Sequence, residues 1–146
     1  MSNLAELGTM PKSIDDIHDY LASGIETGEF TPVKEELEHH FADGLYGRRC
    51  KVKAGTLFTT KVHKKEHISV CLAGKIAVMD EAGDRVELTS PKVFVTPAGT
   101  HRIIYVLEDV DWLTVHAYAA EPDINVVTQE LVCDSRDKYN KLLGEV

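Results

Sequence analysis

The chain has 146 residues, of which 43% are hydrophobic and 27% charged, so we expect one folded domain rather than a disordered chain, with a core that needs neither disulfides nor a structural metal. The net charge of −8 lies almost entirely in residues 1–40, which carry nine acidic and two basic side chains. An acidic arm on a nearly neutral body argues against nucleic acid or an anionic membrane as a partner.

The first predicted element is a helix in the acidic arm. Ser13 is a candidate N-cap, with Asp16 three residues later and acidic side chains in the first turn. We expect the helix to run through Ile17 and Leu21 and to stop near Gly24. The polar segment 28–39 is interpreted as an arm that leads into the body, so residues 1–40 form the first region.

From Leu45 onward, β-branched and aromatic residues become frequent, and turn signals recur every 8–12 residues. Eight short strands without intervening helices predict an all-β, jelly-roll or closed β-barrel domain over 41–120. The tail 121–146 is expected to be partly helical. The predicted strands are 45–53, 56–63, 67–73, 75–80, 84–89, 92–96, 101–107 and 111–118.

The three cysteines, Cys50, Cys71 and Cys133, match no disulfide framework and no cysteine-based zinc site. The N-terminus has no signal-peptide pattern, and no apolar run approaches the length of a membrane span. These features favour a cytoplasmic protein, in the host cytoplasm or in a virion if the gene is viral.

Side chains alternate between the two faces of a strand, and this period predicts a convergence of polar groups. If the relevant faces all point inward, four histidines, a lysine, a tyrosine and a cysteine meet in one cavity. Neutral imidazoles suit iron, zinc, nickel or copper, and three ligands leave positions open for water or substrate. The converging residues are Lys61, His63, His67, Cys71, His101, Tyr105 and His116.

Each candidate also has a simpler explanation. His116 is also compatible with a hydrogen-bonded core histidine, and Cys71 with a small buried core residue. The His39-His40 pair is typical of a polar loop. Lys61 has three interpretations: an anchor for a substrate carboxylate, a base of lowered pKa, or a solvent-exposed side chain. Glu66 is a reserve ligand.

Residues 50–118 resemble the cupin family. Its first motif, G-x5-H-x-H-x(3,4)-E-x6-G, is partly present, with Lys61 at the first histidine, His63 at the second and His67 at the glutamate, seven residues before Gly74. The second motif, P-x-G followed by a histidine, is matched by 97–101 and ends at His101. The resemblance implies a jelly-roll barrel that holds one iron, manganese, nickel or zinc ion, with His63, His67 and His101 carried over as ligands. The segments 39–42, 63–67 and 111–116 are also similar to small cupin-like proteins of tailed phages and bacteria.

Two functions are compatible with these residues. The first is a metal-binding cupin-like protein that binds or acts on a small polar or anionic molecule. Its divalent metal (Fe, Zn, Ni or Mn) would be held by His63, His67, His101 and His116, with Lys61 or Tyr105 in proton transfer. The alternative is a non-catalytic structural or accessory module, such as a phage accessory or virion component. In either case we expect a homo-oligomer, most simply a dimer, with no nucleic-acid or membrane partner.

Overall fold

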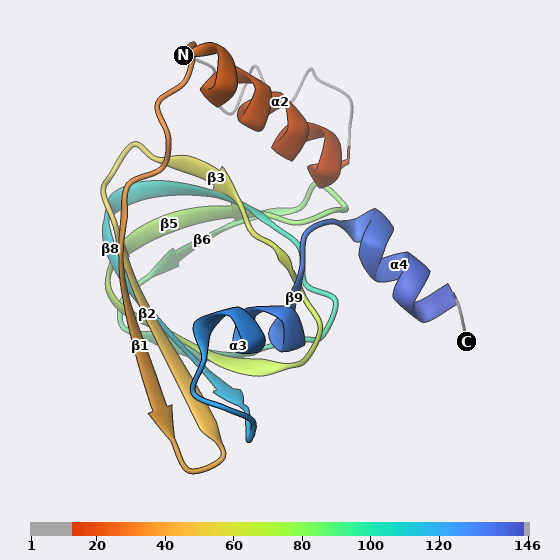
Figure 1. Cartoon of the computed structure of the whole chain (residues 1–146). Coiled ribbons are helices and arrows are strands. Elements are labelled where there is room, and N and C mark those ends of the chain that lie inside the picture. The colour runs from red at the N-terminus through yellow and green to blue at the C-terminus, as the bar shows by residue number, and fades with distance from the viewer. Residues whose placement is uncertain (1–12, 145–146) are drawn as a thin grey trace.

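The computed structural model describes residues 13–144. Its first element is helix α2 (Ile14–Thr27), which lies across one end of the sheet (Figure 1). The Ser13 side chain accepts a hydrogen bond from the Asp16 amide at 3.0 Å, as the capping pattern predicts. The helix does not stop at Gly24 but continues to Thr27 and is capped by Gly28, whose φ is 84°. Gly24 serves packing instead, because a Cβ atom there would overlap the Phe30 ring.

Most of the chain forms one antiparallel sheet with the strand order β1-β2-β8-β5-β6. Two further strands join it, since β3 pairs with β8 and β7 pairs with β5. Within the described residues the edges β1 and β6 do not pair, so the sheet is an open jelly roll and not a closed barrel. The strands are β1 (Glu35–Ala42), β2 (Leu45–Val52), β3 (Leu57–Thr59), β5 (His67–Met79), β6 (Arg85–Thr89), β7 (Lys92–Thr96) and β8 (Ile103–Ala117).

Two long strands, β5 and β8, replace four of the predicted short ones. The expected turns near Gly74 and Asp109 are bends within these strands, where the pairing of β5 with β8 shifts register between Cys71 and Ile76. Gly74 has a φ of 91°, and a Cβ atom there would overlap the Asp109 carbonyl. The bend folds the sheet on itself: the first half of β5 pairs with β7 and the second half with β6.

Strand β1 corrects the predicted arm boundary. Residues 35–42 were expected mostly within the arm, but they pair with β2 along their whole length, from Glu35 opposite Val52 to Ala42 opposite Leu45. Apolar residues alternate with charged ones here, because Leu37 and Phe41 lie on one face and Glu36 and Glu38 on the other. That alternation is a strand pattern that the high acidic content concealed.

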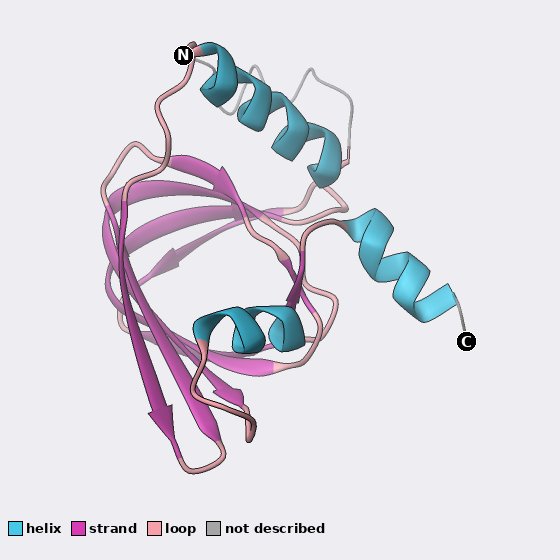
Figure 2. Ribbon diagram, viewed as in Figure 1, coloured by secondary structure: helices cyan, strands magenta, loops and turns pink. Residues whose placement is uncertain are grey.

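The C-terminal segment returns to the sheet, as Figure 2 shows. Helix α3 (Ile124–Leu131) packs Val127 and Leu131 against Tyr46 and Tyr118 of the inner face. Strand β9 (Val132–Cys133) pairs with the two-residue strand β4 (Val62–His63), and helix α4 (Arg136–Gly144) follows. The partly helical tail is therefore confirmed.

The core has an inner and an outer part. Between the two halves of the folded sheet, the fully buried Cys71 and Val106 pack with Ile76 and Val110. On the outer face, α2 buries Ile14 and Ile17 against Ile103. No helix among the described residues is both long and apolar enough to cross a membrane.

Candidate functional site

Three histidines meet on the inner face of the jelly roll. The ring centroids of His63 and His67 are 4.4 Å apart, those of His67 and His116 4.4 Å, and those of His63 and His116 6.4 Å. His67 begins β5, and His116 lies near the end of β8. His63 is fixed by its backbone, since its amide donates to the Thr100 carbonyl at 3.1 Å and its own carbonyl accepts from Gly99 at 2.7 Å. We call His63, His67 and His116 the histidine cluster.

The histidine cluster is electrically neutral at physiological pH. Burial, assisted by the neighbouring imidazoles, lowers the pKa of His63 to about 3 and that of His116 to about 4. Burial also lowers the pKa of His67. The nearby guanidinium groups of Arg48 and Arg102 shift the pKa of His63 in the same direction. Neutral imidazole is the form that binds a transition metal, so these side chains need no deprotonation before ligation.

The ring nitrogens of the histidine cluster are only partly used. His63 Nδ1 is buried and has no hydrogen-bond partner. His116 Nε2 lies 2.8 Å from the Thr114 hydroxyl, and His67 Nδ1 lies 3.4 Å from the Lys65 carbonyl. Each ring thus keeps at least one nitrogen for another ligand. As placed, however, no three His, Cys, Asp or Glu side chains within residues 13–144 form a group that could hold a metal ion. The three imidazoles are donors of the type that transition metals bind, but in this arrangement they do not form a metal site.

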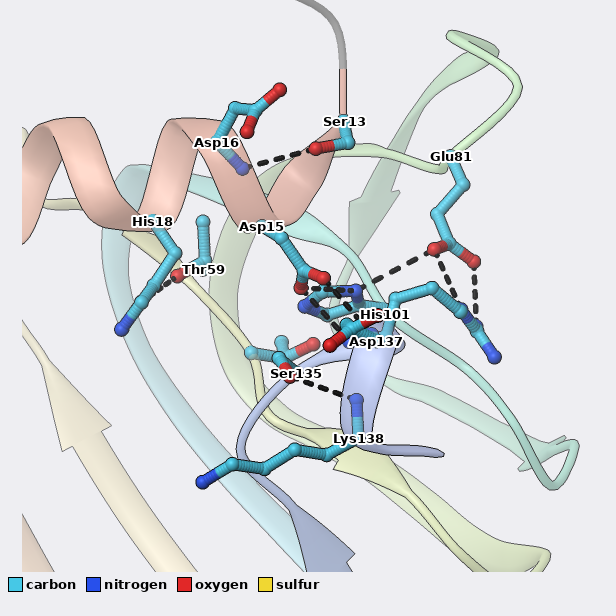
Figure 3. A network of polar contacts seen from close by, with 12 residues as sticks. Ser13, Asp15, Asp16, His18, Thr59, Glu81, His101, Ser135, Asp137 and Lys138 are labelled. Carbon is cyan, nitrogen blue, oxygen red and sulfur yellow. Dashed lines mark hydrogen bonds and ion pairs between the residues drawn. The ribbon is translucent and has the colours of Figure 1, made fainter. Parts of the chain in front are cut away.

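The structure does not bring His101 into the histidine cluster. Its side chain is only 1% exposed and lies by α2, with Nδ1 3.5 Å from Glu81 and 3.8 Å from Asp15 (Figure 3). Arg136 of α4 holds Glu81 through two hydrogen bonds of 2.6 and 2.8 Å. Burial lowers the pKa of His101, against the opposing effect of the two carboxylates. This network ties α2, the β5–β6 turn and α4 together.

The continuity of β8 explains the separation. Because β8 runs unbroken from Ile103 to Ala117, its even-numbered residues face inward along the whole strand, as buried Val106, Val110 and His116 do. His101 precedes this strand with odd parity and lies on the outer side together with Ile103. A turn near Asp109 would have reset the phase, which is why the predicted convergence of all four histidines does not occur.

The two candidate proton-transfer residues also lie away from the histidine cluster. Lys61 is half exposed, and its Nζ lies 3.3 Å from Asp134. Tyr105 faces outward and lines a groove of about 470 Å³ between β3 and the segment 29–34. Cys71 is fully buried in the core, where burial raises the pKa of its thiol, and Glu66 is exposed. Neither Lys61 nor Tyr105 therefore contacts the cluster.

Several residues around the histidine cluster were not predicted. His39, expected in a loop, lies in β1 with Nδ1 2.6 Å from the Tyr46 hydroxyl, and the Tyr46 ring stacks on His116 at 5.7 Å. Arg102 lies on the inner side, next to a cavity of about 250 Å³. The sequence could have indicated Arg102, because it is an even number of residues from His116 and so shares its inward face on one continuous strand. The cavity is lined by Val78, Asp80, Asp84, Val86, Leu88, Lys92, Phe94 and Arg102.

Comparison with known proteins supports the fold. No family model and no curated protein matches the sequence. Among solved structures, the chain is similar to protein NMB1881 of Neisseria meningitidis, with 11% identity, 68% of this chain and 93% of that chain covered, and a TM-score of 0.50. It is also similar to a putative ethanolamine utilization protein EutQ of Salmonella typhimurium (18% identity, 62% and 74% covered, TM-score 0.52). A third is a cupin domain of Bordetella pertussis (10% identity, 62% and 99% covered, TM-score 0.50). At these identities the likeness establishes the fold alone.

Proposed function

We propose that this chain, which has the cupin-type jelly-roll fold, binds one divalent transition metal through His63, His67 and His116. We further propose that a small polar or anionic molecule binds beside the metal. The observation that carries the proposal is the contact of three neutral imidazoles in the interior, with the buried Nδ1 atom of His63 left without a partner. A buried polar atom without a hydrogen bond is costly, and a metal ligand removes that cost.

The surrounding residues support this function. Tyr46, held by His39, packs against the His116 ring and limits its orientation. When bound, the metal (Fe, Zn, Ni or Mn) supplies a Lewis acid within the jelly roll. Arg48 and Arg102 give the interior a positive potential that suits an anionic ligand. His101 is left out of the ligand set because its side chain lies apart from the histidine cluster, beside Glu81 and Asp15, although its buried Nδ1 atom also lacks a hydrogen bond.

Metal analysis of variants tests the ligand assignment. The purified chain should take up about one ion of zinc, nickel, manganese or iron(II), the occupancy of a single three-ligand site. The double variant His63→Ala/His67→Ala should lose this uptake, and His116→Ala should weaken it. The exposed control His40→Ala should bind like the unsubstituted chain. Full uptake by the double variant, or its loss in His101→Ala, would place the ligands elsewhere.

The fold itself should not depend on the metal. The inner core of Cys71, Ile76 and Val106 is buried independently of the histidine cluster. A metal that binds only the folded state adds stability by mass action, about 2.7 kcal/mol at a hundredfold excess over its dissociation constant. We therefore expect a strong chelator to lower the unfolding temperature modestly and to leave the β-sheet circular dichroism at room temperature intact. Unfolding on chelation would mean that the ion is structural.

An exposed apolar face favours a second function, that of an interaction module. On the outer side of the sheet, Val93 and Val95 of β7 are 67% and 60% exposed, and Ile68 of β5 is 45% exposed. The register makes these residues neighbours, since Ile68 lies opposite both Val95 and Val115. Contiguous exposed apolar surface of this kind marks an interaction site.

We propose that a second copy of the chain covers this apolar face. At its rim, Arg49 pairs with Asp111 at 2.6 Å and with Glu38 at 3.6 Å, so both signs of charge are present. A rim with both signs is complementary to itself in a twofold dimer, whereas a basic or acidic partner would require one sign.

Light scattering tests the dimer. We expect a dimeric mass for the unsubstituted chain and a monomeric mass for Val95→Lys. The matched control is Leu143→Lys, a change at a similarly exposed apolar residue on α4, and it should remain dimeric. A monomeric mass for the unsubstituted chain would contradict the proposal.

A further inference from the structure

We propose that the inner cavity beside β6 and β7 binds the carboxylate of a small planar organic acid, with Arg102 pairing the carboxylate and the Phe94 ring packing on the planar body. The cavity measures about 250 Å³, below the range of roughly 300–1,000 Å³ that drug-sized ligands occupy, so its ligand is small. This inference rests on the proposed function, because it names the class of molecule held beside the metal.

Within residues 13–144, Arg102 has a guanidinium without a hydrogen-bonded partner and a backbone held in place by Thr60. Among the described residues, its guanidinium makes no hydrogen bond or ion pair and lies over the face of the Phe94 ring, with Cζ 6.0 Å from the ring centroid. Its backbone is fixed, since its amide donates to the Thr60 hydroxyl at 3.0 Å and its carbonyl accepts from the Thr60 amide at 2.9 Å. A partly buried guanidinium without a partner is costly, and its planar fork matches a carboxylate in a two-bond pair.

The walls of the cavity select a flat, partly apolar ligand. The Phe94 ring is held edge-on by Trp112 at 5.8 Å between ring centroids. Val78, Val86 and Leu88 supply an apolar wall. A planar ring can pack on this apolar wall beside Phe94 while its carboxylate faces Arg102, whereas a small inorganic anion would leave the apolar wall unused.

The acidic groups that line the cavity form no ion pair with Arg102 in the described structure. Lys92 adds a second positive charge at the exposed margin. Asp80 and Asp84 are exposed and belong to the β5–β6 turn, where Asp80 Oδ1 accepts the amides of Ala82 and Asp84, both at 2.9 Å. One oxygen of Asp80 is thus used by the turn, and from the exposed rim its charge opposes the effect of burial, which lowers the pKa of Arg102.

The cavity and the histidine cluster share one strand face. On β7, Phe94 and Thr96 both point inward, and Thr96 lies directly opposite His67 in the register. The Thr96 hydroxyl is hydrogen-bonded to Ser69 at 2.6 Å, so the inner surface between the two sites is polar and ordered. A ligand anchored at Arg102 therefore lies on the same inner face as the histidine cluster.

Benzoate is the probe for the test, with benzyl alcohol as its uncharged counterpart. Binding is followed by amide chemical shifts of the full chain in the presence of a chelator, which separates this test from the metal site. We expect saturable shifts at the cavity residues with benzoate and at least about tenfold weaker binding of benzyl alcohol. The same loss is expected for benzoate with Arg102→Gln, since a hydrogen-bonded charge pair is worth about that factor or more.

Control variants make the outcome decisive. Arg85→Gln removes an exposed arginine of β6 that does not line the cavity, and it should bind benzoate like the unsubstituted chain. Arg102→Lys keeps the charge but loses the planar guanidinium, so its affinity for benzoate should be intermediate. If Arg102→Gln does not fold, Arg102→Lys and Phe94→Leu replace it in the test, and both should bind benzoate more weakly than the unsubstituted chain. Benzoate that fails to saturate, or that binds Arg102→Gln as well as the unsubstituted chain, overturns the inference. Benzoate binding at Arg102 without metal uptake by the chain would overturn only the proposed metal site.

Discussion

Acidification should destabilise the metal-free protein through the histidine cluster. The pKa of His63 is lowered to about 3 and that of His116 to about 4, against an ordinary value of about 6.5 in the unfolded chain. Below pH 6.5 the unfolded state therefore binds protons that the folded state does not, and the free energy of unfolding falls as the pH falls. The stability is fully present above pH 6.5 and is lost progressively toward pH 3–4.

The size of this loss follows from the difference between the pKa of each histidine in the unfolded chain and its lowered pKa in the folded protein. One pH unit corresponds to about 1.4 kcal/mol for each proton taken up on unfolding. Because an unfolded histidine is already half protonated at pH 6.5, each of the two histidines removes roughly 1.5 kcal/mol between pH 6.5 and pH 5, or about 3 kcal/mol together. His67 and His101, whose pKa values are also lowered by burial, act in the same direction. A loss of this size is a large part of the 5–15 kcal/mol by which domains are typically stable.

The assay is urea unfolding at pH 7.5, 6.5, 5.8 and 5.0 with a chelator present, followed by circular dichroism. We expect the free energy of unfolding to fall steeply below pH 6.5. In His116→Gln the slope should be shallower by about 1.4 kcal/mol per pH unit, because one titrating group is gone. The exposed control His40→Gln should keep the slope of the unsubstituted chain. Equal stability at pH 7.5 and 5.0, or an unchanged slope in His116→Gln, would refute the reasoning.

Two further predictions concern the bend and the C-terminal helix. Gly74→Ala should lower the free energy of unfolding by more than about 2 kcal/mol, because it combines a strained φ of 91° with overlap against the backbone. The control Gly83→Ala has a similar φ but open space around the new methyl group, and it should cost only about 1 kcal/mol. Equal costs would show that the close approach at the bend is unimportant. Arg136→Ala removes the two bonds to Glu81 and should cost roughly 1 kcal/mol. Amide exchange should become faster in α4 but not in the sheet, and unchanged exchange in α4 would mean that other contacts hold the helix.

Much of the fold could be predicted from local pattern. The alternation in 85–89 and 92–96 and the turn residues between them place β6 and β7 within about a residue of their observed ends. Gly74 misled the prediction because a glycine with positive φ serves a turn and a bulge equally well, and only long-range pairing distinguishes the two. The acidic residues around Leu37 concealed β1 for a similar reason: β2 determines its conformation, and charge content carries no information about that pairing.

The site could be predicted only in part. His63 and His67 flank a short turn, so their proximity was visible in the sequence. His116 joins them through the inward phase of β8, which period two supplies. His101 and Arg102 exchange roles with respect to the prediction, because the faces of β8 could be assigned only once the strand was known to be continuous. A phase error of one residue therefore placed His101 on the inner face in the prediction, whereas in the structure Arg102 lies there.

The pairing of β4 with β9 joins two segments that are synthesised at different times. Val62 and His63 are translated long before Val132 and Cys133, and α3 is made just before β9. While the polypeptide is still growing, the inner face that carries His63, His67 and His116 is without its later cover. The β4–β9 pair can therefore form beside this face only after the C-terminal segment has been made.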